Sequence, residues 1–289
     1  MTDDVFNRPN PMFWHDIEGP DVLSPGGGDD VFNPFELPKG VARFARPVLG
    51  PGAPAAQAGA RAILVELSHA IAATAADGEN RIIALSDVPA DVRLLVEDAL
   101  GEGEATVLIA GPVEYHIQET LYPGLWDVRT CAPDGAQLDR LLVIGPTPLV
   151  VEAAARDLAD DAVALPDDGP DLMNVRPLLV EIAARMNDHR PGGANHVISL
   201  TNLPMSDADL AALAGAIGGG AIRAHTKGYG AARVTSTRAR GVWQVEYLNS
   251  MGTVILDTIE VGGPPAALVA GREDFEDSAD RLIDLIAVS

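Results

Sequence analysis

From about residue 60 onward, the apolar residues of this chain recur first with the spacing of a helix and then with the alternation of strands, and the whole succession occurs twice. Apolar residues three to four positions apart place one side of a helix against a core. They predict a helix over 63–76 in the first succession and over 177–187 in the second. A short apolar strand follows each helix, over 81–85 and 196–200.

A second helix follows in each succession, and a polar residue stands where it begins. We expect Asp91 and Ser206 to be the N-caps, because their side-chain oxygens can accept a hydrogen bond from a backbone N–H of the first turn. Ser206 starts a capping box in which Asp209 takes the usual place of glutamate. The glycine clusters at 101–103 and 218–220 are expected to end these helices.

Four strands complete each succession, and the last two are joined by residues typical of hairpin turns. These turns are Ala-Pro-Asp-Gly at 132–135 and Asn-Ser-Met-Gly at 249–252. The predicted strands span 105–110, 115–120, 125–130 and 137–144 in the first succession, and 221–226, 232–237, 242–248 and 253–261 in the second.

The two successions are related by a nearly constant offset, which indicates an internal duplication. IIALSDVP at 82–89 returns as VISLTNLP at 197–204, and GLWDV at 124–128 returns as GVWQV at 241–245. We therefore predict an α+β fold made of two tandem copies of one unit, helix, strand, helix and then mostly antiparallel strands, that form a pseudo-symmetric pair.

The repeat also divides the chain. DDVFN occurs at 3–7 and at 29–33, within a stretch rich in proline and glycine, and such segments can dock on a partner or on the protein's own body. The predicted parts are an irregular N-terminal segment over 1–58, a first copy over 59–155, an acidic linker over 156–172, and a second copy with a C-terminal helix over 173–289.

Charge and composition exclude several classes of function. The formal charge is -22, from 42 acidic and 20 basic side chains, and such a surface repels nucleic acid and anionic lipid. No apolar run reaches the ~20 residues of a membrane span, and the first ten residues lack the pattern of a signal peptide. We expect a cytoplasmic protein that binds neither nucleic acid nor membranes. The one cysteine, Cys131, is expected to be a small buried hydrophobe.

Candidate chemistry is sparse. The six histidines lack ligand spacing and there is no Gly-x-Ser-x-Gly motif, so no catalytic residue, cofactor or metal site is predicted. Glu102, His116 and Glu119 are the side chains left for acid and base chemistry. The second copy places Gly219 and Ser236 where the first has the two glutamates, which argues against chemistry shared by both copies.

Trp126 and Trp243 occupy matching positions in the two copies. Strand alternation puts them on one face with Val128 and Val245, so we expect both tryptophans to be buried anchors of their own sheets. The Gly-Tyr-Gly at 228–230 is too short for a phosphate loop and is expected to be a turn between strands.

Six motifs, in order along the chain, resemble one known family. They are ALGEGEATV (99–107), IQETLYPGLWDVR (117–129), DLMN (171–174), LTNLPMSDADL (200–210), TKGYG (226–230) and GVWQVEYLNSMGTVILDTIEV (241–261). Together they resemble the HupH/HyaF family of hydrogenase expression and formation proteins. The candidate functional or motif residues are Glu102, Gly103, Glu119, Trp126, Arg129, Gly228, Tyr229, Gly230 and Trp243.

The resemblance implies a non-catalytic accessory factor for the maturation of an uptake NiFe hydrogenase, without a cofactor of its own. The implied partners are the precursor of the iron–sulfur small subunit, before its export, and a thioredoxin-like hydrogenase accessory protein. The resemblance also implies, in some systems, protection of the clusters from oxygen. With Cys131 as the single cysteine, shielding by surface contact is favoured over direct ligation of a cluster.

Two alternatives stay open on the sequence. One is an enzyme whose active site lies in the groove between the two copies and uses Glu102, His116 or Glu119. The other is electrostatic attraction between the acidic surface and a partner segment that carries arginines, such as a twin-arginine export signal.

Overall fold

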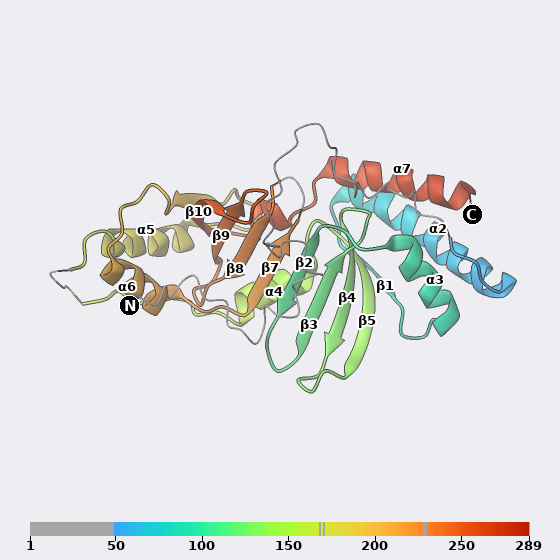
Figure 1. Cartoon of the computed structure of the whole chain (residues 1–289), viewed down its shortest axis with the longest axis horizontal. Coiled ribbons are helices and arrows are strands. Elements are labelled where there is room, and N and C mark those ends of the chain that lie inside the picture. The colour runs from blue at the N-terminus through green and yellow to red at the C-terminus, as the bar shows by residue number, and fades with distance from the viewer. Residues whose placement is uncertain (1–48, 168, 170, 228–229, 289) are drawn as a thin grey trace, which may run out of the picture. The chain divides into compact units, whose positions relative to one another are not determined.

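The computed structural model describes residues 49–167, 169, 171–227 and 230–288, and residues 48–289 form one compact unit (Figure 1). Both DDVFN segments lie outside the described residues.

The same order of elements occurs in both halves of this unit, as the sequence predicts. The first half holds α2 (Pro54–Asp77), β1 (Arg81–Ala84), α3 (Ala90–Leu100), β2 (Ala105–Ile109), β3 (Glu114–Glu119), β4 (Leu125–Cys131), β5 (Gln137–Ile144) and α4 (Leu149–Asp157). The second half holds α5 (Val175–Asp188), β6 (His196–Ser199), α6 (Asp207–Ile217), β7 (Ile222–Thr226), β8 (Ala232–Ser236), β9 (Val242–Leu248), β10 (Val254–Val261), the 3-10 helix η1 (Ala266–Leu268) and α7 (Arg272–Val288).

The helix starts confirm one predicted cap and correct the other. At α6 the capping box is present: Asp209 N donates to Ser206 Oγ at 3.1 Å, and Ser206 N donates to Asp209 Oδ2 at 3.0 Å. Asp91 is not the cap of α3, because Pro89 takes the N-cap position without a side-chain hydrogen bond. The extended backbone of Pro89 lets the helix begin at the next residue, so Asp91 falls in its first turn, where its charge still favours the helix dipole.

The ten strands of the described residues form one antiparallel sheet in the order β1-β5-β4-β3-β2-β7-β8-β9-β10-β6, and Figure 1 shows β2 beside β7. The central pair joins the halves: β2 and β7 run antiparallel, with Thr106 opposite His225 and Leu108 opposite Arg223. The expectation of a separate sheet for each tryptophan is therefore wrong. The exposed edge that each half would present is instead paired with its counterpart, which satisfies the backbone groups of both strands.

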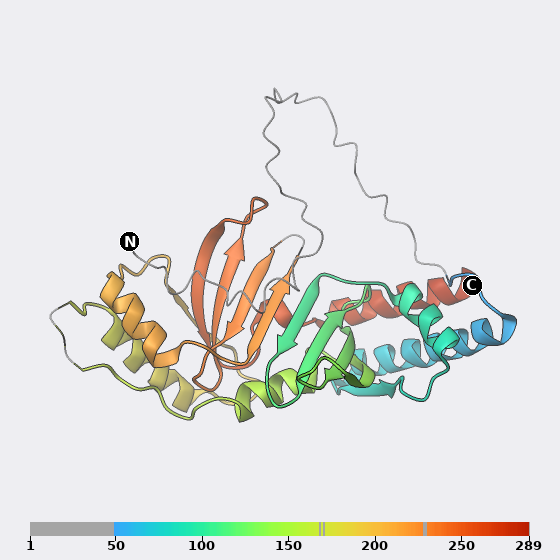
Figure 2. The ribbon, with the colours of Figure 1, turned by 60° about the horizontal axis from the view of Figure 1, so that its bottom comes forward.

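One face of the sheet carries an apolar core that runs across both halves. Trp126 and Trp243 are each 1% exposed and belong to the same cluster of buried side chains, together with Val151 of α4 and Leu268 of η1. Figure 2 shows α4 running along this side of the strands. The predicted burial of both tryptophans is confirmed, but they share a core. Cys131 is buried as expected.

The other face is covered by helices only toward its two ends. Helices α2, α3 and α7 pack over β1, β4 and β5 through Leu64, Leu282 and Leu142, all fully or almost fully buried. The C-terminal helix α7 thus lies against α2 of the first half, as Figure 1 shows. At the other end α5 packs on α6 and β10. Side chains near the middle of this face are therefore left to polar contacts and solvent.

In the part of the chain that the structure describes, no helix combines the length and the apolar character needed to cross a membrane.

Candidate functional site

The residues singled out by the motifs divide into buried anchors, backbone positions and polar side chains. Trp126 donates from Nε1 to the carbonyl oxygen of Gly145 at 3.0 Å, deep in the core. Trp243 is equally buried. Both tryptophans therefore stabilise the shared core.

Two of the motif glycines have a backbone role. Gly103 N donates to the carbonyl oxygen of Glu119 at 2.7 Å, and a Cβ at this position would overlap the carbonyl oxygen of Thr120. Gly230 lies in a turn with φ of 99°, a conformation that favours glycine. Gly228 and Tyr229 lie outside the described residues.

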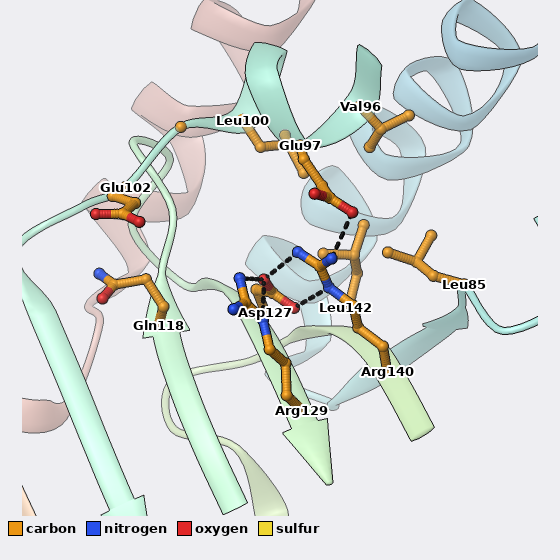
Figure 3. Close-up of a pocket in the computed structure, with 11 residues that line it drawn as sticks. Leu85, Val96, Glu97, Leu100, Glu102, Gln118, Asp127, Arg129, Arg140 and Leu142 are labelled. Atoms are coloured by element: carbon orange, nitrogen blue, oxygen red, sulfur yellow. Dashed lines mark hydrogen bonds and ion pairs between the residues drawn. The ribbon is translucent and has the colours of Figure 1, made fainter. Parts of the chain in front are cut away.

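The polar side chains gather on the face opposite the tryptophans, around Asp127. Arg140 of β5 binds this carboxylate in a bidentate manner: its Nε donates to Oδ1 at 2.9 Å and its Nη2 donates to Oδ2 at 2.6 Å. The remaining Nη1 donates to Glu97 of α3. Arg129 of β4 also donates to Asp127, from Nη2 at 3.0 Å. Figure 3 shows these four side chains, which we call the Asp127 cluster, pointing toward one another from two strands and one helix.

The Asp127 cluster is largely shielded from solvent. The side chains of Asp127 and Arg140 are 12% and 11% exposed. Burial alone would lower the pKa of Arg140, but the hydrogen bonds and negative charge of Asp127 and Glu97 outweigh it and raise this pKa. A bidentate arginine–carboxylate pair of this kind fixes geometry as well as charge. The cluster ties α3 to the sheet.

A cavity of about 160 Å³ lies beside the cluster (Figure 3). Its polar wall consists of Glu102, Gln118 and Arg129 in addition to the buried ion pair, and Leu100 and Leu142 are among its apolar lining. Gln118 is held in place because its Nε2 donates to the carbonyl oxygen of Ala105 at 3.2 Å. The arrangement is a small polar niche with one half-exposed guanidinium, Arg129, at its rim.

A second cavity, of about 190 Å³, lies on the tryptophan face where β2 meets β7. Glu119 and Trp126 line it from the first half and Thr226 from the second. Burial raises the pKa of Glu119, and the negative charges of Glu104 and Asp274 add to this rise, whereas the backbone N–H of Gly124, 3.4 Å away, opposes it.

The three side chains left for acid and base chemistry are not brought together. Glu119 shares the face of Trp126, its cross-strand neighbour, whereas His116 and Glu102 lie on the face of the Asp127 cluster. His116 is exposed and contacts Glu114 at 3.8 Å. The sequence alternative placed Glu102, His116 or Glu119 in a groove between the copies; β2 and β7 are joined by backbone pairing there, and Glu119 is the one of the three that lines a cavity with residues of both halves.

Three members of the Asp127 cluster were not predicted from the sequence. Arg129 is a motif residue, but Asp127, Arg140 and Glu97 were not singled out. The available signal is that Arg129 and Arg140 are cross-strand neighbours in the predicted hairpin, which is unfavourable without an anion between them. Asp127, two residues before Arg129 on the same face, supplies it.

The matching positions in the second half carry different charges. Gln244 takes the place of Asp127, and Asp257 takes the place of Arg140. Gln244 Nε2 donates to Asp257 Oδ1 at 3.1 Å. Burial, opposed by the hydrogen bond from Gln244 and helped by the nearby charge of Glu246, raises the pKa of Asp257 to about 6. The two halves share positions on the sheet but not a common ion cluster. Within the described ranges, no three side chains of histidine, cysteine, aspartate or glutamate come together in a way that could hold a metal ion.

Comparison with known proteins shows the family. The sequence model of the HupH hydrogenase expression protein, C-terminal conserved region, matches this chain twice, over residues 58–167 and 172–289. The chain belongs to the HupH hydrogenase expression protein family. The hydrogenase expression/formation protein HupH of Rhizobium leguminosarum bv. viciae is 37% identical over 77% of this chain and 79% of its own length. HoxQ of Azotobacter vinelandii, with the same description, is 35% identical over 91% of this chain and 96% of its own. The hydrogenase-1 operon protein HyaF of Escherichia coli K12 is 34% identical over 78% of this chain and 79% of its own length.

The two segments matched by the HupH family correspond to the two halves of the structure. The first runs from within α2 through α4 and contains the whole Asp127 cluster, and the second contains α5 through α7. The halves are linked beyond the β2–β7 pair, because Thr147 Oγ1 donates to the carbonyl oxygen of Leu268 at 2.7 Å and Ala270 N donates to that of Pro146 at 2.9 Å.

Proposed function

We propose that this HupH family member is a non-catalytic accessory factor for the maturation of an uptake NiFe hydrogenase. The observation that carries the proposal is the double match to the family, together with relatives named as hydrogenase expression/formation proteins over most of their length. Its two halves act as a pseudo-symmetric pair of tandem copies that present one composite surface.

The partner in this proposal is the precursor of the iron–sulfur small subunit, which the protein binds or shields in the cytoplasm before export. A thioredoxin-like hydrogenase accessory protein is the second proposed partner. Two features support a binding role. Trp126 and Gly103 among the motif residues serve the shared core and the backbone geometry, and the buried ion cluster fixes α3 on the sheet. A rigid sheet of this width gives a partner a broad and well-ordered surface to contact.

Co-purification tests the proposal. A tagged small-subunit precursor is isolated from cells that express the hydrogenase and this protein, and the amount of this protein retained is measured. We expect retention with the precursor and none with the exported, mature subunit. Absence of association in cells that make active hydrogenase would refute the proposal.

An enzyme is the alternative function, and the cavity at the β2–β7 junction is the observation that favours it. Glu119 lines this cavity with a raised pKa, as a general acid would. The variant Glu119→Gln separates the two functions. If hydrogenase activity in cells is unchanged while the precursor is still retained, an enzyme that uses the carboxylic acid of Glu119 is excluded.

A further inference from the structure

The sheet ends at two strands that occupy matching positions in the two halves. Within the described residues, β1 pairs with β5 alone and β6 pairs with β10 alone, so each strand leaves one side of its backbone outside the sheet (Figure 1). Val197 of β6 takes the place that Ile82 has in β1. Both side chains are exposed, by 58% for Ile82 and 54% for Val197. Each half therefore keeps an exposed β-branched side chain on a terminal strand.

The register of β1 against β5 shows which backbone groups point away from the sheet. Leu85 N donates to the carbonyl oxygen of Arg140 at 3.1 Å, and this pair continues the register of the two strands. Because hydrogen-bonded and non-bonded pairs alternate along two antiparallel strands, Ile82 and Ala84 direct their N–H and C=O groups outward. No residue that the structure describes pairs with these groups. Such a row of donors and acceptors is a template for one more strand.

The usual protection of a free edge is only partly present on β1. Its sequence, Arg-Ile-Ile-Ala, holds neither proline nor lysine, and its pairing with β5 has no bulge. Its length of four residues limits what can pair with it. A second copy of this chain would bring another formal charge of -22 to so short a contact, which disfavours self-association through this edge.

Acidic side chains stand at both ends of this edge. Glu79 precedes β1 and Asp87 follows it, and both are exposed. In the part of the chain that the structure describes, neither carboxylate makes a hydrogen bond or a close ion pair. Arg81 lies between them, but its guanidinium is bound by Asp77, with Nη2 2.6 Å from Oδ2, and it interacts with Glu79 only through the more distant charge. Three carboxylates therefore outnumber one guanidinium, and the edge carries a net negative charge.

The second half provides a comparison within the same molecule. Ala194 takes the place of Glu79, and Asn202 takes the place of Asp87. The edge of β6 thus keeps the short strand and the exposed Val197 but lacks these two carboxylates. A ligand that recognises both the backbone and the charge would distinguish the two edges.

We propose that the outer edge of β1 binds an extended segment of a protein partner as an added strand, and that this segment carries lysine or arginine at both ends. The outward groups of Ile82 and Ala84 pair with its backbone, and the side chain of Ile82 contacts an apolar residue of the segment. Glu79 and Asp87 attract its basic ends. Nucleic acid and lipid lack the alternating amide groups that this edge requires. The inference goes beyond the proposed function, because it names a contact surface and the chemistry of its partner, and it holds whether or not that partner belongs to a hydrogenase.

Fluorescence anisotropy with a labelled heptapeptide, Lys-Val-Thr-Val-Thr-Val-Lys, tests the inference on the full chain. The strand β1 spans about 13 Å, so a segment of this length covers the edge and passes both of its ends. The variant Ile82→Pro removes an outward N–H without removing a hydrogen bond to β5, and proline is tolerated at such positions. Val197→Pro is the matched control at the equivalent position of β6. We expect the wild type and the control to bind the peptide, and Ile82→Pro to weaken binding on the order of tenfold.

A second pair of variants removes charge instead. The double variant Glu79→Gln with Asp87→Asn should weaken binding of the same peptide about fivefold in ~0.1 M salt, since each exposed ion pair contributes little alone. The control is Asp171→Asn with Asp188→Asn, two exposed residues of the second half that change the net charge equally. It should leave binding within about twofold.

Circular dichroism confirms that each variant is folded. If Ile82→Pro does not fold, Ile82→Lys replaces it, with Val197→Lys as its control, because a lysine on the edge repels the basic segment. No binding at ~1 mM peptide, or equal weakening by the test variant and its control, would overturn the inference. Equally tight binding of Glu-Val-Thr-Val-Thr-Val-Glu would overturn the choice of basic ends.

Discussion

Arg140 and Asp127 form a bidentate ion pair between neighbouring strands, with nitrogen–oxygen distances of 2.9 and 2.6 Å. Both side chains are nearly buried, and the pair is completed by Glu97 from α3 and Arg129 from β4. The cluster therefore holds a helix on the sheet as well as two strands together. Breaking such a pair on one side leaves uncompensated charge in a shielded place, which costs more than the pair itself contributes.

Replacing Asp127 should destabilise the fold strongly. The variant Asp127→Asn leaves the guanidinium groups of Arg129 and Arg140 without their shared anion, and we expect the free energy of unfolding to fall by about 3 kcal/mol. Urea denaturation followed by circular dichroism measures it. Asp157→Asn removes an exposed ion pair with Arg156 and should leave the urea midpoint unchanged. Equal midpoints for the two variants would show that the cluster does not hold the fold.

Asp209 links α6 to the start of α5, and its removal should be comparably damaging. It is fully buried, and its Oδ1 accepts from the backbone N–H groups of Met173 at 2.9 Å and Val175 at 3.1 Å, while Oδ2 completes the capping box with Ser206. The variant Asp209→Ala leaves these donors unpaired, and we expect a loss of about 3 kcal/mol in unfolding free energy. Asp207→Ala is the control, because Asp207 lies in the same first turn but outside the capping box. It should lower the unfolding free energy by less than about 1 kcal/mol. If the two losses are equal, the buried contacts of Asp209 do not govern stability.

The sequence predicts the elements of this fold well because each is specified locally. The Ser206 capping box, the glycine stops and the alternation around Trp243 depend on neighbours within a few residues, and each is confirmed. Asp209 shows where local reasoning ends. Its role in the capping box is visible in the sequence, whereas its hydrogen bonds to residues 173–175 depend on how two helices pack.

The joining of the halves could not be predicted from either copy alone. Strands β2 and β7 are apolar and alternating, as any half-buried strand is, and nothing in their sequences marks Thr106 and His225 as neighbours. One candidate site follows from this join. The cavity beside Glu119 draws residues from the two halves, so its composition appears only when the sheet is complete.

Asp257 should make stability fall as the pH rises above about 4. Its pKa is about 6 in the folded protein against 3.8 as the ordinary value, so the folded state binds the proton more tightly than the unfolded state. Folding is therefore favoured while the group is protonated, and this contribution is lost between pH 4 and 6. The shift corresponds to about 2 to 3 kcal/mol.

The variant Asp257→Asn isolates this contribution. The difference in unfolding free energy between variant and wild type is measured from pH 4 to 8, because His225, whose pKa is lowered, changes stability in the opposite direction in both proteins. We expect the variant to gain stability relative to the wild type as the pH rises, and to match it near pH 4. A difference that does not vary with pH would contradict the raised pKa.

Two glycine substitutions should have effects of opposite sign on stability. Gly103→Ala places a Cβ against the carbonyl oxygen of Thr120, between the end of α3 and β2, where backbone must move to accept it. We expect a loss of about 2 kcal/mol or more, as for other forced contacts in packed structure. Gly215→Ala lies on the exposed side of α6 with nothing within 4 Å of the new Cβ, so it should gain about 1 kcal/mol from helix propensity. Thermal unfolding of both variants against the wild type measures the two shifts. The chemical change is identical in the two variants. A lower midpoint for Gly103→Ala and a higher one for Gly215→Ala would show that the motif glycine is needed for close backbone packing. An unchanged midpoint for Gly103→Ala would contradict this role.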